Sequence, residues 1–220
     1  MAKRKEPLAA PYSERLKDLM AFVAFTNKFR AVKRTIWFAG ADDDSPERDG
    51  EHSFQNDLVA LYLNERLGLG LNPFKLSIYA KVHDLPEYLK GDASAFPDLL
   101  GHVPTLSRKD KESREKEATA QIERDWGSKF PTMVEALHAY RSQKDEESRF
   151  IYALEKLVAV INIYQDGGRT FKRTGANFEE HNAYKTPRVR KHPVVKLLYD
   201  ELRKLLKERE SELFPVTGTK

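Results

Sequence analysis

Four ionisable side chains, spread over three separate parts of the sequence, have the chemistry to bind one divalent metal ion. They are His52, the adjacent pair His83 and Asp84, and Glu155. Imidazole nitrogen and carboxylate oxygen suit Mn²⁺, Co²⁺, Fe²⁺, Ni²⁺ or Zn²⁺, and Mg²⁺ is a further candidate. If the four side chains converge, we expect a metal-dependent hydrolase. If they do not, the sequence indicates little beyond a helical domain.

Taken one at a time, these residues have ordinary structural explanations. His52 opens a helix, where a histidine is commonly a surface or capping residue, and His83 alone fits a core histidine with satisfied hydrogen bonds. Glu155 could form a salt bridge with an arginine of a neighbouring helix. Their arrival on three apolar helices is what favours a shared metal site.

Apolar residues recur at helical spacing through most of the chain, and no segment shows the alternation of a β-strand. The helices predicted before the C-terminal one are Ser13 to Arg30, Glu51 to Leu67, Pro73 to about His83, Lys109 to Arg124, Pro131 to Arg141, and Phe150 to Tyr164. A loop is predicted from there to about His192. We therefore predict an all-α helical bundle in a single domain over residues 1–220, with a core over about 13–168 and a C-terminal helix over about 193–213.

The helix that starts at Pro73 should present His83 to the interior. His83 follows Leu76 and Tyr79 on one helix face, at the spacing of a buried stripe. Pro86 cannot continue a helix and biases the residue before it away from helical geometry. The helix is therefore expected to end near His83, where a loosened backbone lets neighbouring side chains turn toward one point.

Glu155 lies in the most apolar helix of the sequence, which should therefore be central in the bundle. A carboxylate in such a helix is costly unless it is paired with a cation or binds a metal. Asn162 and Asp166 share the face of Glu155, so a polar stripe is predicted on a buried element.

The local motifs carry a family resemblance. They are HDLPE at residues 83–87, RTIW at 34–37 upstream of His52, and ALEKL at 153–157. In this order they resemble the HD-domain metal-dependent phosphohydrolases, and within them the branch of the bacterial 5'-deoxynucleotidases. The resemblance covers roughly residues 16–168.

The resemblance implies a ligand set. His52 matches the first histidine ligand of the family, and His83 and Asp84 match the histidine–aspartate pair that gives the family its name. Glu155 stands where the family usually has an aspartate. Glutamate is one methylene longer and can bind through one or two oxygens, so metal affinity and preference should differ while binding is retained.

The resemblance also implies catalytic and substrate-binding residues. Glu87 matches an acid near the attacking water, and Asp92 matches a second acid of the active site. Arg34 matches an arginine that contacts the substrate phosphate, and Trp37 lies near the position of an aromatic residue that packs against the sugar.

The activity implied by this set is phosphate release from a small nucleotide. The foremost candidate is hydrolysis of a (deoxy)nucleoside 5'-monophosphate by metal-activated water, without a covalent intermediate. One alternative is a deoxynucleoside triphosphate triphosphohydrolase. An alternative of another class is a non-catalytic HD module that binds nucleotide or nucleic acid, and the departure at Glu155 keeps this alternative open.

Composition limits the other possibilities. The chain has 220 residues, a net charge of +4 and no cysteine, which excludes disulfides, thiolate metal sites and a cysteine nucleophile. No apolar run approaches the roughly twenty residues that span a bilayer, and the basic start lacks the apolar core of a signal peptide. We therefore expect a cytoplasmic protein without membrane contact.

A small nucleotide is the expected partner, because a modest positive charge suits an anionic substrate. The basic run at 188–192 lacks the interleaved aromatic residues of nucleic-acid binding sites, so nucleic acid is not expected as a partner. The resemblance implies a homodimer, to which the leucine-rich C-terminal helix could contribute an interface.

Overall fold

The computed structural model describes residues 12–42, 45–90 and 107–215. Over these residues the chain is helical, without a β-strand, and a single isolated β-bridge joins Lys33 to Arg48. The helices are α1 (Tyr12–Phe29), α2 (Asp49–Arg66), α3 (Pro73–Val82), α4 (Glu87–Lys90), α5 (Arg108–Trp126), α6 (Pro131–Ser142), α7 (Glu146–Gln165), α8 (Arg169–Thr174), α9 (Phe178–Val189), α10 (Pro193–Glu208) and α11 (Glu210–Leu213). The all-α prediction is confirmed.

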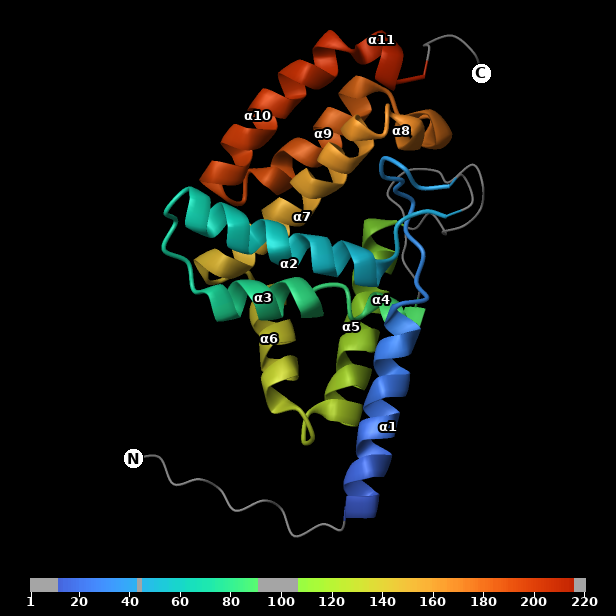
Figure 1. Cartoon of the computed structure of the whole chain (residues 1–220), viewed down its shortest axis with the longest axis vertical. Helices are drawn as coiled ribbons and strands as arrows, with labels where there is room; N and C mark the ends of the chain where they lie inside the picture. The colour runs from blue at the N-terminus through green and yellow to red at the C-terminus, as the bar shows by residue number, and fades with distance from the viewer. Residues whose placement is uncertain (1–11, 43–44, 91–106, 216–220) are drawn as a thin grey trace.

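Helix α7 is the centre of the bundle. It packs against α2, α3, α6, α9 and α10, and Figure 1 shows it between these helices. Its buried face includes Phe150, Ile151, Leu154 and Val160, each exposed by 1% or less. A helix with apolar residues on nearly every side has to be covered from several directions, which places Glu155 deep inside the protein.

The N-terminal end of α7 fixes α3 against it. Asp145 is the N-cap of α7 and accepts a hydrogen bond from the backbone N–H of Ser148. The same carboxylate accepts one from the Tyr79 hydroxyl, at 2.7 Å, and pairs with Lys75 at 3.0 Å. One capping residue therefore starts the central helix and attaches α3, the helix that leads into His83.

The prediction of a loop between Tyr164 and about His192 is wrong, because α8 and α9 lie there. Gly168 and Gly175 adopt left-handed backbone angles, φ +76° and +68°, which end one helical segment and permit the next. Helix α9 starts at a capping box formed by Asn177 and Glu180. Pro187 inside α9 hides the helix from sequence patterns, because proline lacks the N–H that a helix interior requires.

The predicted C-terminal helix is divided at Arg209 into α10 and α11. The second piece turns back onto α8, where the ring of Phe214 stacks on Phe171 with centroids 4.2 Å apart. A Cβ atom on Gly168 would overlap the backbone of Leu213, so glycine permits this close approach.

Helix α1 packs through aromatic residues. The ring of Phe22 meets Trp126 of α5 edge-on at a centroid distance of 5.1 Å, and Phe25 is buried beside it. The opposite face of α1 leaves Leu16, Leu19, Met20 and Val23 exposed, so the helix carries apolar residues on both faces. None of the helices in the described ranges has the length and apolar character needed to cross a bilayer.

Candidate metal centre

Four predicted ligands converge on one point between α2, the end of α3, and α7. Nε2 of His52 lies 3.9 Å from Oε2 of Glu155 and 4.0 Å from Oδ2 of Asp84. Nε2 of His83 lies 3.8 Å from the same Glu155 oxygen and 3.1 Å from the same Asp84 oxygen. Ligands bound at about 2.1 Å to one ion lie about 3 Å apart when adjacent and about 4.2 Å apart when opposite. The four distances fall in or near this range, and His52, His83 and Glu155 offer ligand atoms that all lie within 4.8 Å of one another, whereas Asp84 forms a neighbouring group with Asp49 and Glu87.

The hydrogen bond of His83 directs the lone pair of its Nε2 toward this point. Nδ1 of His83 lies 2.9 Å from the carbonyl oxygen of Ala80, which can only accept, so Nδ1 carries the hydrogen. Nδ1 of His52 lies 3.3 Å from Oε2 of Glu47, and the amide nitrogen of Asn56 lies 2.9 Å from Nε2 of His52. Metal-binding histidines characteristically have such a partner on the nitrogen that faces away from the ion.

His83 provides the test of whether the residues fit a metal. Its Nε2 is fully buried and has no hydrogen-bond partner among the residues that the structure describes, yet it lies beside a carboxylate oxygen. A lone pair and a carboxylate that face each other repel unless a proton or a metal ion lies between them. Two imidazoles and two carboxylates are the donor set of a divalent transition metal, so the residues fit the ion.

Glu155 is held in place by two donors. The Tyr140 hydroxyl donates to Oε1 at 2.9 Å, and the Lys156 ammonium pairs with Oε2 at 2.9 Å. Burial alone would raise the pKa of Glu155, but the positive charges of Lys156 and His83 lower that pKa overall. The carboxylate is therefore ionised and oriented. The cation that pairs with Glu155 is the adjacent Lys156. The sequence analysis had named an arginine of a neighbouring helix as the alternative to a metal ion.

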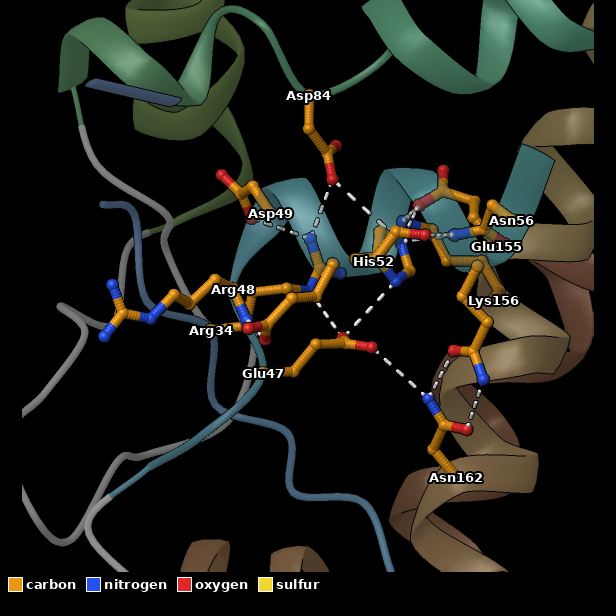
Figure 2. A network of polar contacts seen from close by, with 12 residues as sticks. Arg34, Glu47, Arg48, Asp49, His52, Asn56, Asp84, Glu155, Lys156 and Asn162 are labelled. Carbon is orange, nitrogen blue, oxygen red and sulfur yellow. Dashed lines mark hydrogen bonds and ion pairs between the residues drawn. The ribbon is translucent and has the colours of Figure 1, made fainter. Parts of the chain in front are cut away.

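Arg34 lies against three acids, one of which is the predicted ligand Asp84 (Figure 2). Its Nη1 is 2.7 Å from Oδ2 of Asp84 and 3.1 Å from Oδ1 of Asp49, and its Nε is 3.1 Å from Oε2 of Glu47. All four side chains are buried. The predicted phosphate-binding arginine is thus at the site, and in this structure its guanidinium neutralises carboxylates.

The charges around Asp84 set its protonation. Burial would raise the pKa of Asp84, but the charges of His83 and Arg34 hold it well below its usual value. For His83, burial would lower the pKa, and the charge of Asp84 raises it overall. Without a metal, the two side chains therefore form an imidazolium–carboxylate pair.

Glu47 and Asp49 were not identified from the sequence. Glu47 connects the site to α7, because its Oε1 accepts from the side chain of Asn162 at 3.3 Å. Asp49 is fully buried at the start of α2. A signal was present, since Asp49 precedes His52 by one helical turn and shares its face. Asn162, part of the predicted polar stripe, belongs to this network. Asp166, the other residue of that stripe, pairs with Arg169 at 2.6 Å instead.

The two predicted catalytic acids differ in outcome. Glu87 begins α4, is buried, and pairs with Lys111 at 3.2 Å. It offers a carboxylate oxygen that lies within 4.8 Å of oxygens of Asp49 and Asp84, so it is beside the ligand cluster. Asp92 lies outside the described residues.

Trp37 is not among the residues that converge. Its side chain is 1% exposed, its ring faces the guanidinium of Arg173 at 4.4 Å, and its backbone N–H donates to Thr170 at 3.1 Å. The ring thus packs against α8 in the interior. A contact of Trp37 with a substrate sugar would require a rearrangement of this packing.

The chain belongs to the HD-domain family, because the model of that family matches residues 26–196. A crystal structure described as a predicted metal-dependent phosphohydrolase from Magnetospirillum magnetotacticum superimposes with a TM-score of 0.69 at 23% identity, covering 91% of this chain and 99% of that one. A conserved hypothetical protein from Pyrococcus furiosus superimposes with a TM-score of 0.55 at 16% identity, covering 86% of this chain and 99% of that one.

A protein from Pyrococcus horikoshii gives a TM-score of 0.56 at 20% identity and covers 86% of this chain and 98% of that chain. At these identities the similarity establishes the fold. A search of curated proteins found no significant match.

Proposed function

We propose that this protein is a metal-dependent phosphohydrolase that releases phosphate from a small nucleotide, foremost a (deoxy)nucleoside 5'-monophosphate. The observation that carries this proposal is that Nε2 of His52 and Nε2 of His83 each lie 4.0 Å or less from a carboxylate oxygen of Asp84 and one of Glu155. Membership of the HD-domain family supports it. The ligand assignment and the nucleotide substrate are both parts of the proposal.

A divalent ion held by these four residues would lower the pKa of water and polarise a phosphoryl group. The chain supplies the other groups. Glu87 lies beside the ligand cluster, where its carboxylate can orient a water molecule or accept its proton. Asp92 is a second candidate for this role.

Arg34 is the proposed phosphate-binding residue. Its Nη1 contacts the Asp84 oxygen that faces both histidines, so a cation bound there would compete with Arg34 for this oxygen. Displaced from Asp84, the guanidinium could donate two parallel hydrogen bonds to phosphate oxygens while Glu47 and Asp49 keep it in place.

The position of Glu155 favours the enzyme over a non-catalytic HD module. Although it is longer than the usual aspartate, its Oε2 reaches to 3.8 Å and 3.9 Å from the two Nε2 atoms. Tyr140 and Lys156 hold it there. A ligand role gives a buried, ionised carboxylate at this point a function beyond its pair with Lys156.

The test is a substrate panel combined with metal analysis. The purified protein should retain a divalent metal and, with Mn²⁺ or Co²⁺, release orthophosphate from nucleoside monophosphates. Release of tripolyphosphate from deoxynucleoside triphosphates would favour the triphosphohydrolase alternative. Asp84→Ala should lose metal and turnover together. A wild-type protein that binds no metal and hydrolyses no nucleotide would refute the proposal.

A further inference from the structure

An open cleft lies between the end of α1 and the start of α2. Its volume is about 690 Å³, and its walls include Arg30, Arg48 and Phe54. Sites that bind small organic molecules commonly have volumes of about 300–1,000 Å³. Among the described residues, the lining of this cleft includes none of the four proposed metal ligands. The cleft is therefore a second concave surface, beside the metal centre and separate from it.

The segment before α2 turns its side chains alternately toward the metal centre and toward the cleft. Glu47 and Asp49 each lie 3.1 Å from the guanidinium of Arg34. The side chain of Arg48, between them, extends away from the ligand cluster (Figure 2). Arg48 has extended backbone angles, φ −108° and ψ 154°, and neighbouring side chains of an extended segment point to opposite sides. This short segment therefore links the metal centre to the cleft.

Lys33 faces Arg48 across the isolated antiparallel β-bridge. The hydrogen bonds of the bridge join the residues on either side of this pair, at 2.8 Å and 3.2 Å. In a pair of this type the Cα atoms are about 4.5 Å apart and both side chains lie on the same face. Two like charges placed directly opposite each other are destabilising. The bridge thus holds two cations together beside the cleft.

Arg30 adds a third cation. Its carbonyl oxygen lies 3.5 Å from Nη1 of Arg48, and its side chain crosses Gly50, where a Cβ would lie 3.5 Å from Cγ of Arg30. Within the described part of the chain, Arg30, Lys33 and Arg48 form no ion pair with an acid. Glu51 also lines the cleft, but its carboxylate caps α2 by accepting from the backbone N–H of Arg48 at 3.0 Å. The cleft therefore has an excess of positive charge.

Phe54 gives the cleft an aromatic wall. Its side chain is 67% exposed, and it lies one helical turn beyond Gly50 on α2. Guanidinium groups bind phosphate oxygens through forked hydrogen bonds, and an exposed aromatic ring can stack on a nucleic-acid base. Paired arginines and a ring at one cleft are the groups that recognise a phosphate joined to a base.

We propose that this cleft binds a nucleoside phosphate, with the phosphate between Arg30 and Arg48 and the base against Phe54. The inference goes beyond the proposed function, because this ligand lies outside the metal centre and is not hydrolysed there. The negative charge of the phosphate offsets the repulsion between Lys33 and Arg48. Through Arg48, the ligand contacts the segment that holds Arg34 at the metal centre.

The test uses a nucleoside 5'-phosphonate, whose carbon–phosphorus bond resists hydrolysis, titrated by calorimetry into the full-length, Mn²⁺-loaded protein. We expect one binding event at the metal centre and a second in the cleft. Arg30→Met and Arg48→Met should each weaken the cleft event about tenfold, because each removes one charge-assisted contact. Arg66→Met alters an exposed arginine at the other end of α2 and should leave both events unchanged.

The aromatic wall has its own matched control. Phe54→Ala should weaken phosphonate binding in the cleft about tenfold, because the ring no longer stacks on the base. Binding of inorganic pyrophosphate, which has no base, should stay as in the wild type. Phe74→Ala removes a ring of similar exposure, 64% against 67%, from α3 and should change neither.

The binding events separate this proposal from the proposed function. Binding that is the same in the wild type and in the variants of Arg30, Arg48 and Phe54 would overturn the cleft site alone. A single event that these variants weaken, and that Asp84→Ala leaves unchanged, would support the cleft and contradict the proposed metal centre.

A measurement on the wild-type chain covers the case of a variant that does not fold. Phenylglyoxal modifies accessible arginines, and mass spectrometry reports the rate at each one. Saturating phosphonate should slow modification of Arg30 and Arg48 and leave Arg66 unaffected. Equal rates with and without phosphonate would contradict the proposal. Protection that follows protein concentration instead of phosphonate would show that a second copy of the chain covers the cleft, which would also overturn it.

Discussion

Nη1 of Arg34 lies 2.7 Å from Oδ2 of Asp84, the oxygen that also faces Nε2 of both histidines. The guanidinium therefore occupies one side of the carboxylate on which the metal would bind. Arg34 balances the negative charge of the buried acids when no metal is present. Metal and arginine then share one anionic group, and their effects on stability should depend on each other.

Replacing Arg34 should destabilise the metal-free protein most. Arg34→Met leaves Glu47, Asp49 and Asp84 buried without their shared cation, and removing one partner from a buried ion pair costs about 3–5 kcal/mol. Mn²⁺ at saturation should reduce this loss, because the ion partly replaces the missing charge. Urea unfolding with and without Mn²⁺ measures both values, and an equal loss in the two conditions would contradict the shared role.

The pair of Asp84 and His83 should give the metal-free protein a distinct pH profile. The lowered pKa of Asp84 contributes stability above about pH 3.9, its unfolded value, which is lost as the pH falls through the folded value. The raised pKa of His83 contributes stability below about pH 6.5, which is lost as the pH rises through the folded value. The contribution of the pair is therefore largest between these limits.

Denaturant unfolding of the metal-free protein across this pH range, compared with Asp84→Asn, isolates that contribution. The stability difference between wild type and variant should be greatest between about pH 4 and 6.5 and should shrink on both sides. A difference that is constant over the range would show that the two groups do not titrate as a pair.

Tyr140 should matter for metal affinity although it does not touch the ion. Its hydroxyl donates to Oε1 of Glu155 at 2.9 Å and fixes the carboxylate. Tyr140→Phe should weaken metal binding about 10- to 100-fold, the usual effect of removing a partner that orients a ligand. Competition with a chelator of known affinity measures the change.

Tyr79→Phe is the matched control for Tyr140→Phe. This hydroxyl is on the neighbouring helix and donates to Asp145, the N-cap of α7, at 2.7 Å. Its loss should reduce stability and leave metal affinity unchanged. An equal loss of metal affinity in both variants would assign the effect to packing.

Two adjacent glycines test how the C-terminal helix docks. Gly167 and Gly168 both have positive φ, +72° and +76°, so alanine at either position costs about 1–2 kcal/mol in backbone conformation. A Cβ at Gly168 would also overlap the backbone of Leu213, whereas one at Gly167 meets no atom within 4 Å. Gly168→Ala should therefore be the more destabilising in urea unfolding, and equal losses would show that α11 does not pack there.

The elements with a regular apolar pattern were predictable. Helices α2, α3, α6 and α7 begin within a few residues of their expected starts. Pro73 and Pro131 mark the N-termini of α3 and α6, and Gly68 follows the end of α2. Helix α8 was missed because it is short and polar, and α9 because it is polar and contains Pro187. In these segments tertiary contacts with α7 and α11, which no local pattern contains, supply the stability.

The site was predictable where residue type and spacing carried information. The four candidate ligands came from motifs and from the cost of a buried carboxylate, as Glu155 shows. The environment that controls them came from distant parts of the chain. Arg34 meets Asp49 and Asp84 only because the segments that carry them fold together. Periodicity contains no information about such contacts.

Anomalous scattering from a crystal of the Mn²⁺-loaded protein tests the central claim most directly. A single strong peak is predicted about 2.0–2.3 Å from Nε2 of His52, Nε2 of His83, Oδ2 of Asp84 and Oε2 of Glu155. An anomalous peak elsewhere, or one that the side chain of Glu155 does not reach, would contradict the account of this site.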